Sequence, residues 1–202
     1  MAKESVKSRE ERAKSSTSPE ELEKLAENEE WIVREIVAAN TNTPVHVLEK
    51  LAKDEDKDVC YAVSENVNIT TSILEKLAKD TNGNVHYSVA GNPNTPVSLL
   101  EKLAQDKDES VRSSVAENPN TPVSLLEKFA KSENEEERKA VARNANTPVS
   151  LLEKLAEDEN DKKYANAFVR DEVARNLNTP VPVLEKLAED EDWQGRSGVA
   201  RN

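Results

Sequence analysis

The chain has 202 residues and a formal net charge of −12, and its seven aromatic residues leave a core to be built from Leu, Val, Ile and Ala. Four scattered glycines argue against a phosphate-cradling loop, and one cysteine excludes an intrachain disulfide, a cysteine-rich zinc site and a cysteine-ligated iron–sulfur cluster. No run approaches the roughly 18 apolar residues of a membrane span. We therefore expect a cytoplasmic protein without a membrane partner.

Residues 1–16 are polar and come before the regular part of the sequence. The segment ESVKS at 4–8 resembles ESVRS at 109–113, and the charged EERAKSS after it is typical of a half-repeat that covers the end of a stack. The sequence predicts a polar capping segment at 1–16 and a single repeat domain at 17–202.

A thirteen-letter pattern recurs through the rest of the chain. Copies such as NTNTPVHVLEKLA and NPNTPVSLLEKLA begin at 40, 66, 92, 118, 144 and 176. A partial copy precedes them and a half-copy, GRSGVARN, ends at Asn202, so we count seven units of about 26 residues, the mark of a solenoid. The longer last step predicts a six-residue insertion within 157–168, in a surface loop. Because the chain stops where each earlier unit starts its turn, we expect a longer array.

The first half of each unit predicts a helix. In the unit that begins at 118, Thr121 suits the N-cap and Pro122 the first helical position, where a missing N–H costs nothing. Val123, Leu126 and Phe129 recur at helical spacing and predict one apolar stripe.

The second half of each unit predicts a second short helix, of barely two turns. It carries two valines four residues apart, as in Val111 and Val115, and ends at an asparagine. Asparagine tolerates the left-handed conformation that often closes helices, so we expect that conformation there. Helices this short need burial between stacked neighbours to be stable.

The combined pattern VRxxVAxNxNTPxxLLEKLAxD resembles the leucine-rich repeat variant family of bacterial proteins and, more distantly, HEAT repeats. The resemblance implies an all-α, right-handed superhelical solenoid that serves as an interaction scaffold. Its second helices are short, in α or 3₁₀ form, and lie on the concave side. One relative has an iron–sulfur cluster in a cysteine-bearing domain, which does not carry over because this chain lacks those cysteines.

Catalytic and metal-binding patterns are weak. His46 and His86 lie 40 residues apart without motif partners, and we interpret His46 as solvated. The acidic segments 54–58 and 157–162 lack the glycine and terminal glutamate of calcium loops. Cys60 has no neighbouring Lys or Arg in the sequence to activate it. We predict no catalytic residue, no metal site and no cofactor.

The second helices are neutral to basic although the chain is acidic. Arginine follows the first valine in most units, and related solenoids use an arginine there to bond the acidic linker of an adjacent unit, so the resemblance implies a structural role, which we favour over contact with a ligand. We name no structural partner for Arg143 and Arg175, which are therefore better candidates for ligand contact.

Two units depart from the arginine pattern and have Cys60 and His86 at its position, each followed by a tyrosine. On one face, Tyr61, His86 and Tyr87 predict an aromatic patch that either anchors a peptide or packs as ordinary surface filler. The candidate partner-binding residues are Tyr61, His86, Tyr87, Arg112, Arg138, Lys139, Arg143, Arg170 and Arg175.

We therefore predict a monomeric, non-enzymatic scaffold that binds a protein or peptide with acidic and apolar groups on its concave second-helix face. The alternative is nucleic-acid binding through the C-terminal arginines, against which the charge of −12 weighs. A HEAT-like lyase or glycosylase ranks third.

Overall fold

A computed structural model describes residues 4–157 and 168–202, and within these residues the chain forms fifteen helices and no strand. This confirms the all-α repeat architecture. The helices divide into two compact parts, Met1–Leu99 and Leu100–Asn202, which we call the N-terminal and C-terminal parts and describe separately.

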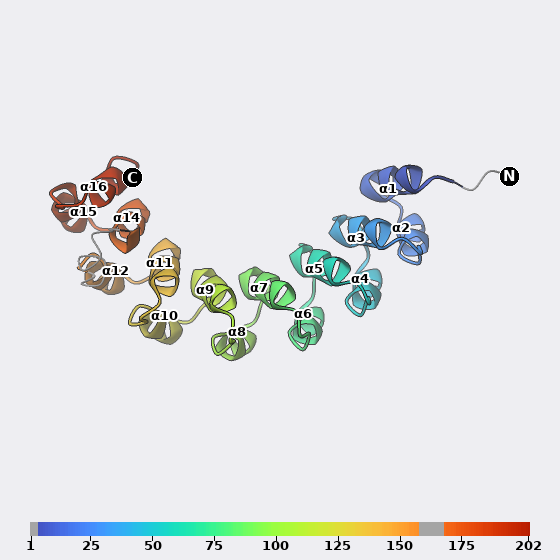
Figure 1. The fold of residues 1–202 in the computed structure, drawn as a ribbon, viewed down its shortest axis with the longest axis horizontal. Coiled ribbons are helices and arrows are strands. Elements are labelled where there is room, and N and C mark those ends of the chain that lie inside the picture. Colours follow the sequence, from blue (N-terminus) through green and yellow to red (C-terminus); the bar gives the residue numbers. More distant parts are fainter. Residues whose placement is uncertain (1–3, 158–167) are drawn as a thin grey trace. The chain divides into compact units, whose positions relative to one another are not determined.

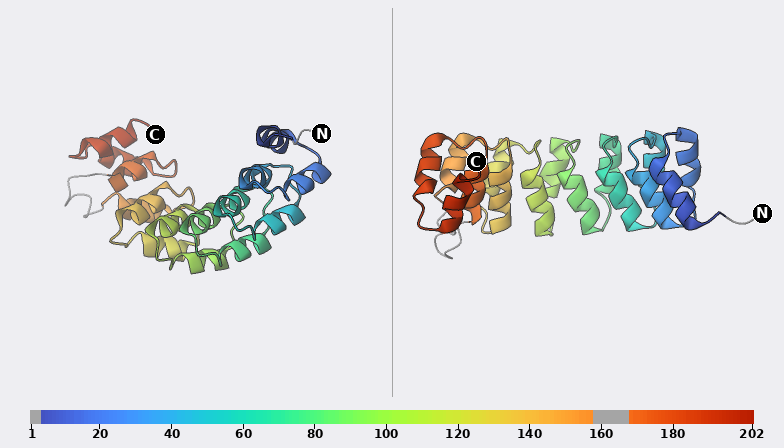
Figure 2. Two further views of the ribbon diagram at one scale, coloured as in Figure 1. Left: turned by 45° about the vertical axis from the view of Figure 1, so that its right-hand side comes forward. Right: turned by 90° about the horizontal axis from the view of Figure 1, so that it is seen from above.

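In the N-terminal part the helices alternate between two rows (Figures 1 and 2). The first helices of the units are α2 (Pro19–Leu25), α4 (Val45–Leu51) and α6 (Thr71–Leu77). The second-helix row consists of α1 (Val6–Ser15), α3 (Trp31–Ala39), α5 (Lys57–Glu65) and α7 (Gly83–Gly91). Neighbouring second helices pack directly on one another, α1 on α3, α3 on α5 and α5 on α7.

The C-terminal part repeats this arrangement, and α8 (Val97–Leu103) runs across the division. Its first helices are α10 (Val123–Phe129), α12 (Val149–Leu155) and α15 (Val181–Ala188). Its second helices are α9 (Glu109–Glu117), α11 (Glu135–Arg143), α14 (Phe168–Arg175) and α16 (Trp193–Val199). Several second helices have nine residues against seven in most first helices, and they are α-helices. Both kinds of helix are short, as expected, and the second helices are α rather than 3₁₀.

The first helix begins one residue later than expected. Pro122 is the N-cap of α10, with φ −66° and ψ 149°, and the helix starts at Val123. The hydroxyl of Thr121 donates instead to the carbonyl of Val115, near the end of the preceding second helix, which also accepts from the Asn118 N–H (3.1 Å). Val123 is 47% exposed, so the apolar stripe of this helix reduces to the buried Leu126 and Phe129.

The asparagine that ends each second helix acts through its side chain rather than through a left-handed backbone. Asn66 has φ −70° and ψ 130°, which is extended. Its Nδ2 donates to the carbonyls of Ala38 (2.7 Å) and Asn40 (3.0 Å) in the preceding unit, and its Oδ1 accepts from the Asn68 N–H (2.9 Å). Nδ2 bonds of this kind to the preceding unit recur at Asn40, Asn92, Asn144, Asn176 and Asn202.

The core lies between the two rows of helices. Val59 and Val63 of α5 and Leu48 and Leu74 of the first helices on either side are fully buried. Each such side chain contributes on the order of 1.5–3 kcal/mol when it leaves water. Because this burial is supplied by neighbouring units, the short helices are stable in the stack.

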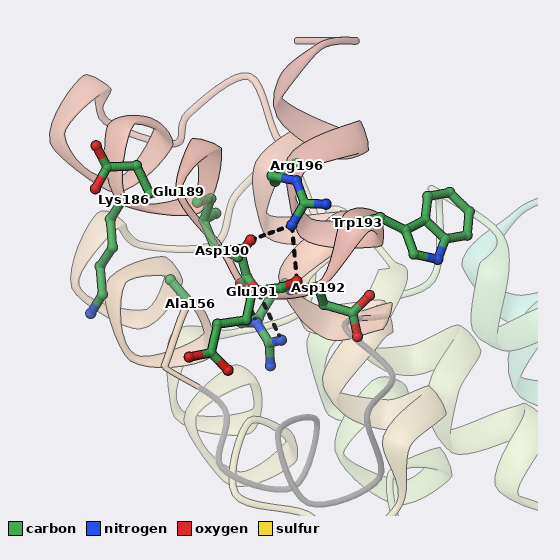
Figure 3. Close-up of a pocket in the computed structure, with 10 residues that line it drawn as sticks. Ala156, Lys186, Glu189, Asp190, Glu191, Asp192, Trp193 and Arg196 are labelled. Atoms are coloured by element: carbon green, nitrogen blue, oxygen red, sulfur yellow. Dashed lines mark hydrogen bonds and ion pairs between the residues drawn. The ribbon is translucent and has the colours of Figure 1, made fainter.

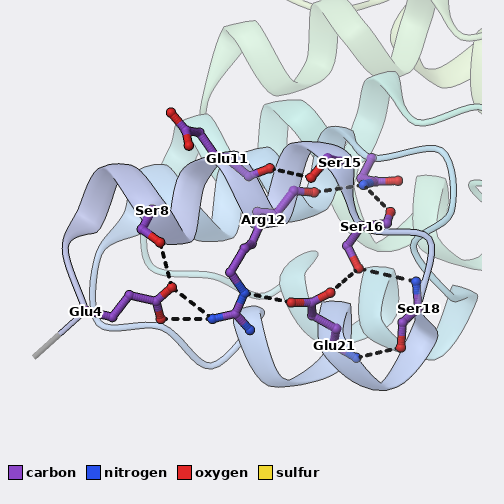
Figure 4. A network of polar contacts seen from close by, with 10 residues as sticks. Glu4, Ser8, Glu11, Arg12, Ser15, Ser16, Ser18 and Glu21 are labelled. Atoms are coloured by element: carbon purple, nitrogen blue, oxygen red, sulfur yellow. Dashed lines mark hydrogen bonds and ion pairs between the residues drawn. The ribbon is translucent and has the colours of Figure 1, made fainter. Parts of the chain in front are cut away.

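A polar network joins α1 to α2 (Figure 4). Arg12 donates from Nε to the Glu21 carboxylate (2.7 Å) and from Nη1 to that of Glu4 (2.9 Å), and Ser16 donates to Glu21 (2.7 Å). On its other side α1 packs against α3. Helix α1, the first of the second-helix row, thus carries charged groups that bond to α2. That 1–16 are a cap separate from a repeat domain at 17–202 remains a prediction.

The predicted insertion lies almost entirely outside the described residues, since only Glu157 and Phe168 at its two ends belong to them. Among the described helices, none combines the length and the apolar character that crossing a membrane requires.

Candidate functional site

The arginine of the second helix joins two consecutive units. In α3, Arg34 donates from Nε and Nη2 to the Asp54 carboxylate (2.7 and 2.8 Å), in the linker of the next unit. Its Nη1 donates to the carbonyl of Asn28 in its own linker (2.8 Å). Both partners lie in linkers between helices, so the expected structural role is confirmed.

The same role recurs along the C-terminal part, with local substitutions. Arg170 donates to Asp190 (2.7 Å), as Arg34 does to Asp54. Arg112 donates to Glu137 (2.6 Å), because Ser132 stands where other linkers have an aspartate. The Nη1 of Arg138 donates to the Ser132 carbonyl (2.8 Å), and Arg138 and Arg170 are each only 4% exposed. These guanidinium groups therefore donate hydrogen bonds to acceptors of the repeat stack itself.

The linker aspartates are held in their charged form by these contacts. Burial alone would raise the pKa of Asp54, but the hydrogen bonds from Arg34 and from the Asp56 N–H hold that pKa below its ordinary value. Asp190 has a lowered pKa for the same reasons, through Arg170 and the Asp192 N–H. The acidic linkers therefore serve as hydrogen-bond acceptors and helix caps.

At Cys60 the link between units is made by a different residue. Cys60 is 1% exposed and its thiol donates to the Asp54 carbonyl (3.4 Å), while Lys57 bonds the carboxylate of Asp80 in the next linker (2.7 Å). Lys57 also lies close enough to favour the thiolate, so the expectation of no neighbouring cation was wrong. Burial is the larger effect and raises the pKa of Cys60, which disfavours the reactive thiolate.

Arg143 and Arg175 have structural partners, contrary to expectation. Arg143 lies near Glu172 (3.2 Å), Glu117 (3.4 Å) and Glu136, carboxylates of three neighbouring second helices. Arg175 pairs with Asp171 one turn earlier (2.7 Å). Lys139 bonds Glu136 (2.7 Å) and lies 5.2 Å from the centre of the Phe168 ring. The cations of this surface are therefore compensated by carboxylates.

Tyr61 and Tyr87 occupy the same repeat position on α5 and α7, which pack together. They are 37% and 48% exposed, whereas Val59 and Val85, two residues earlier, are fully buried. His86 is half-buried between them in sequence. The structure thus places the two tyrosines on one side of the second-helix row, as the repeat spacing predicted.

Three carboxylates share this side of the row, and the sequence reasoning missed them. Glu35 on α3 holds the repeat position of the two tyrosines. Asp58 and Glu65 are exposed on α5, three residues before and four after Tyr61, and thus on its helix face. Glu65 accepts a hydrogen bond from the Ser88 hydroxyl of α7 (2.6 Å). The 26-residue spacing, applied to charged positions as well as to aromatic ones, would have found Glu35.

Among the residues that the structure describes, the remaining titratable groups form no cluster that could ligate a metal ion. The His46 side chain is 63% exposed and lies 3.6 Å from Glu23, in line with its interpretation as solvated. No group of three or more His, Cys, Asp or Glu side chains that could hold a metal ion occurs in residues 4–157 and 168–202. That the protein has no catalytic residue and no cofactor remains a prediction.

A cavity of about 810 Å³ lies in the C-terminal part, between Ala156, α14, α15 and α16 (Figure 3). Charged groups in its lining bond to one another and to the backbone of the stack. Asp190 accepts from Arg170, and Arg196 donates to the carbonyls of Asp190 and Glu191. Figure 3 shows the Trp193 ring pointing away from these residues. We therefore base no site on this cavity.

No protein-family model matches the chain, and no curated protein matches it. Among solved structures, a leucine-rich repeat variant with a novel repetitive structural motif is similar, with 27% identity and a TM-score of 0.61. The match covers 91% of this chain and 71% of that one.

Two further solved structures are less similar. An engineered protein from a structural genomics consortium is 17% identical with a TM-score of 0.38, over 96% of this chain and 72% of its own. Computationally designed armadillo repeat proteins for modular peptide recognition give 17% identity and a TM-score of 0.28, over 98% and 99%. Because both scores are below 0.5, we draw nothing from these two. The chain is an all-α helical-repeat protein similar to the leucine-rich repeat variant.

Proposed function

We propose that this helical-repeat protein is a non-enzymatic scaffold that binds a protein or peptide on the second-helix face of its N-terminal part. The observation that carries the proposal is the pair Tyr61 and Tyr87, exposed at one repeat position on two helices that pack together. Large aromatic side chains with few rotatable bonds bury much area at low entropic cost, which makes them effective anchors.

The packing of the rows favours this face over the first helices. Second helices pack directly on one another, whereas each first helix contacts chiefly the second helices beside it. Elements that approach each other more closely lie on the inner side of a curved stack, so we assign the second helices to the concave side. A concave surface contacts a partner from several units at once.

The arginines of the C-terminal part give less support to the nucleic-acid alternative. Arg138 and Arg170 are buried, and Arg143 and Arg175 lie against carboxylates, so little positive charge is available for phosphates. Duplex DNA binding that falls steeply with salt and is lost in Arg143→Glu would favour that alternative. With one cysteine, held as a buried thiol, the cytoplasm is the compartment we propose.

The proposal is tested with binders selected from a randomised twelve-residue peptide library against the full chain. We expect Tyr61→Ala and Tyr87→Ala to raise the dissociation rate by about tenfold or more, as loss of a buried anchor does. The matched control is His46→Ala, an exposed ring on a first helix of the same part, which should change that rate less than about twofold. Equal effects of His46→Ala and the tyrosine variants would refute the assignment.

A further inference from the structure

Tyr61 has acidic residues on the same face of its own helix and at the equivalent position of the preceding one. Along the row, Glu35, Tyr61 and Tyr87 occupy one repeat position of the packed helices α3, α5 and α7. Along α5, Asp58 and Glu65 lie about one turn before and after Tyr61. We call these five residues the tyrosine surface. It combines two exposed aromatic rings with three carboxylates.

The negative charge of the tyrosine surface is not balanced by the cations of the same helices. Arg34 on α3 is ion-paired with Asp54, and Lys57 on α5 is ion-paired with Asp80. Within the described residues, Glu35 and Asp58 take part in no ion pair. Ser88 donates to Glu65 but is neutral, so it leaves the charge of that carboxylate in place.

The carboxylates also act on one another. Partial burial and the nearby charges of Asp58 and Asp56 raise the pKa of Glu35 above its ordinary value. Burial is the larger cause and the two charges are the smaller one, and a cation beside Glu35 would offset both. A positively charged group is therefore favoured beside Glu35, and an acidic one is disfavoured.

We propose that the tyrosine surface binds a lysine or arginine side chain of a basic peptide segment. Carboxylates at the edge of an aromatic face favour an ammonium or guanidinium group, which the ring attracts from its face while the carboxylates accept its hydrogen bonds. This proposal rests on the proposed function and names the chemistry of the partner. It reverses the acidic partner expected from the summed charge of the second helices.

The C-terminal part provides the contrast within the same chain. Lys139 holds the tyrosine position there, and it bonds Glu136 on its own helix. Arg143 likewise lies among three carboxylates. A row whose charges are already paired offers a basic segment little gain, so binding should be confined to the N-terminal part.

The experiment measures fluorescence polarisation of labelled twelve-residue peptides on the full chain. Two probes share a Ser/Ala host and one central leucine, and they carry either four lysines or four glutamates. The decisive variant is Glu35→Gln with Asp58→Asn. Because the protein is acidic overall, the control is Glu127→Gln with Glu153→Gln, two exposed carboxylates of first helices whose loss changes the net charge equally.

We expect the lysine peptide to bind and the glutamate peptide not to bind. Glu35→Gln with Asp58→Asn should weaken lysine-peptide binding about tenfold, and the control less than about twofold. Equal weakening by the two double variants, or absence of lysine-peptide binding, would overturn the proposal.

The test also separates this inference from the proposed function. If the glutamate peptide binds and Tyr61→Ala abolishes its binding, the tyrosines anchor a peptide but the basic partner is wrong. If Tyr61→Ala leaves the binding of both probes and of all library-selected peptides unchanged, the proposed function itself fails.

Discussion

Substitution of Asn144 by alanine tests how the repeats are held together. Asn144 is 1% exposed, and its Nδ2 donates to the carbonyls of Ala116 and Asn118 at 2.8 Å each. Its Oδ1 accepts from the Asn146 N–H at 2.8 Å. Asn144→Ala therefore removes three hydrogen bonds and leaves the Ala116 carbonyl and the Asn146 N–H unsatisfied next to a methyl group, whereas the Asn118 carbonyl keeps the Thr121 N–H (3.0 Å).

The expected cost follows from these three bonds. Each contributes about 1 kcal/mol net, and a buried polar group left without a partner costs on the order of 1–3 kcal/mol. We expect Asn144→Ala to lower the free energy of unfolding by about 3–5 kcal/mol, in urea titrations followed by far-UV circular dichroism. Asn144→Asp should cost at least as much, because it sets a carboxylate against two carbonyl oxygens.

The neighbouring Asn146 is the matched control. It is exposed and donates one hydrogen bond from Nδ2, to the Pro119 carbonyl (2.7 Å), so Asn146→Ala should cost no more than about 1 kcal/mol. Equal losses for Asn144→Ala and Asn146→Ala would refute the view that the buried carboxamide joins consecutive units. A harmless Asn144→Asp would refute it as well.

Two further predictions concern the linkers. Because Arg34 lowers the pKa of folded Asp54, this pair stabilises the fold above the unfolded pKa of about 3.9, and the contribution is lost as pH falls through the lower folded value. Asp54→Asn should therefore destabilise the protein at pH 7 and reduce the stability difference between pH 7 and pH 2, measured by urea titration. Cys60, buried with a raised pKa, should react with iodoacetamide only as fast as the protein unfolds; rapid alkylation of folded protein would contradict its burial.

Much of the fold could be predicted from the sequence, because the same residue pattern recurs at equivalent positions of each unit. The 26-residue period and the recurring leucines indicated helix pairs, and the structure buries leucines such as Leu48, Leu74 and Leu100 completely. The role of Arg34 was also accessible, because the resemblance to related solenoids implied a bond from this repeated arginine to an acidic linker. A repeated polar residue at a fixed position points to a structural partner.

Local rules failed where a tertiary contact decided the outcome. The left-handed tendency of asparagine is a property of an isolated turn, whereas Asn66 is placed by two carbonyls of another unit. In the same way Thr121 fits an N-cap locally, but its hydroxyl finds the Val115 carbonyl of the preceding helix. Neither partner lies within the few residues that capping rules consider.

The candidate site was predicted only in part, because charge was summed along helices rather than across them. The tyrosines were found from their departure from the arginine pattern. Glu35 was not, because it follows an ordinary arginine, although it holds the position of Tyr61 one unit earlier. Summing along α11 likewise counted Arg143 as available charge, whereas carboxylates of α9 and α14 lie against it.

The repeat separates the positions that hold the stack from those that can vary. Where Arg34 is replaced by Cys60, Lys57 restores a bond to the next linker aspartate, so an ion pair between units is maintained even when its residue changes. The following position has no such shared partner, and it holds Glu35, Tyr61, Tyr87, Ser113, Lys139, Asp171 and Ser197. Because this position makes no bond that all units share, its residue can differ from unit to unit without loss of the fold. The packing between units, which recurs along the stack, supports the face on which it lies. Binding specificity in this protein should therefore be determined at that position, and the tyrosine surface is where its residues are largest and its charge least compensated.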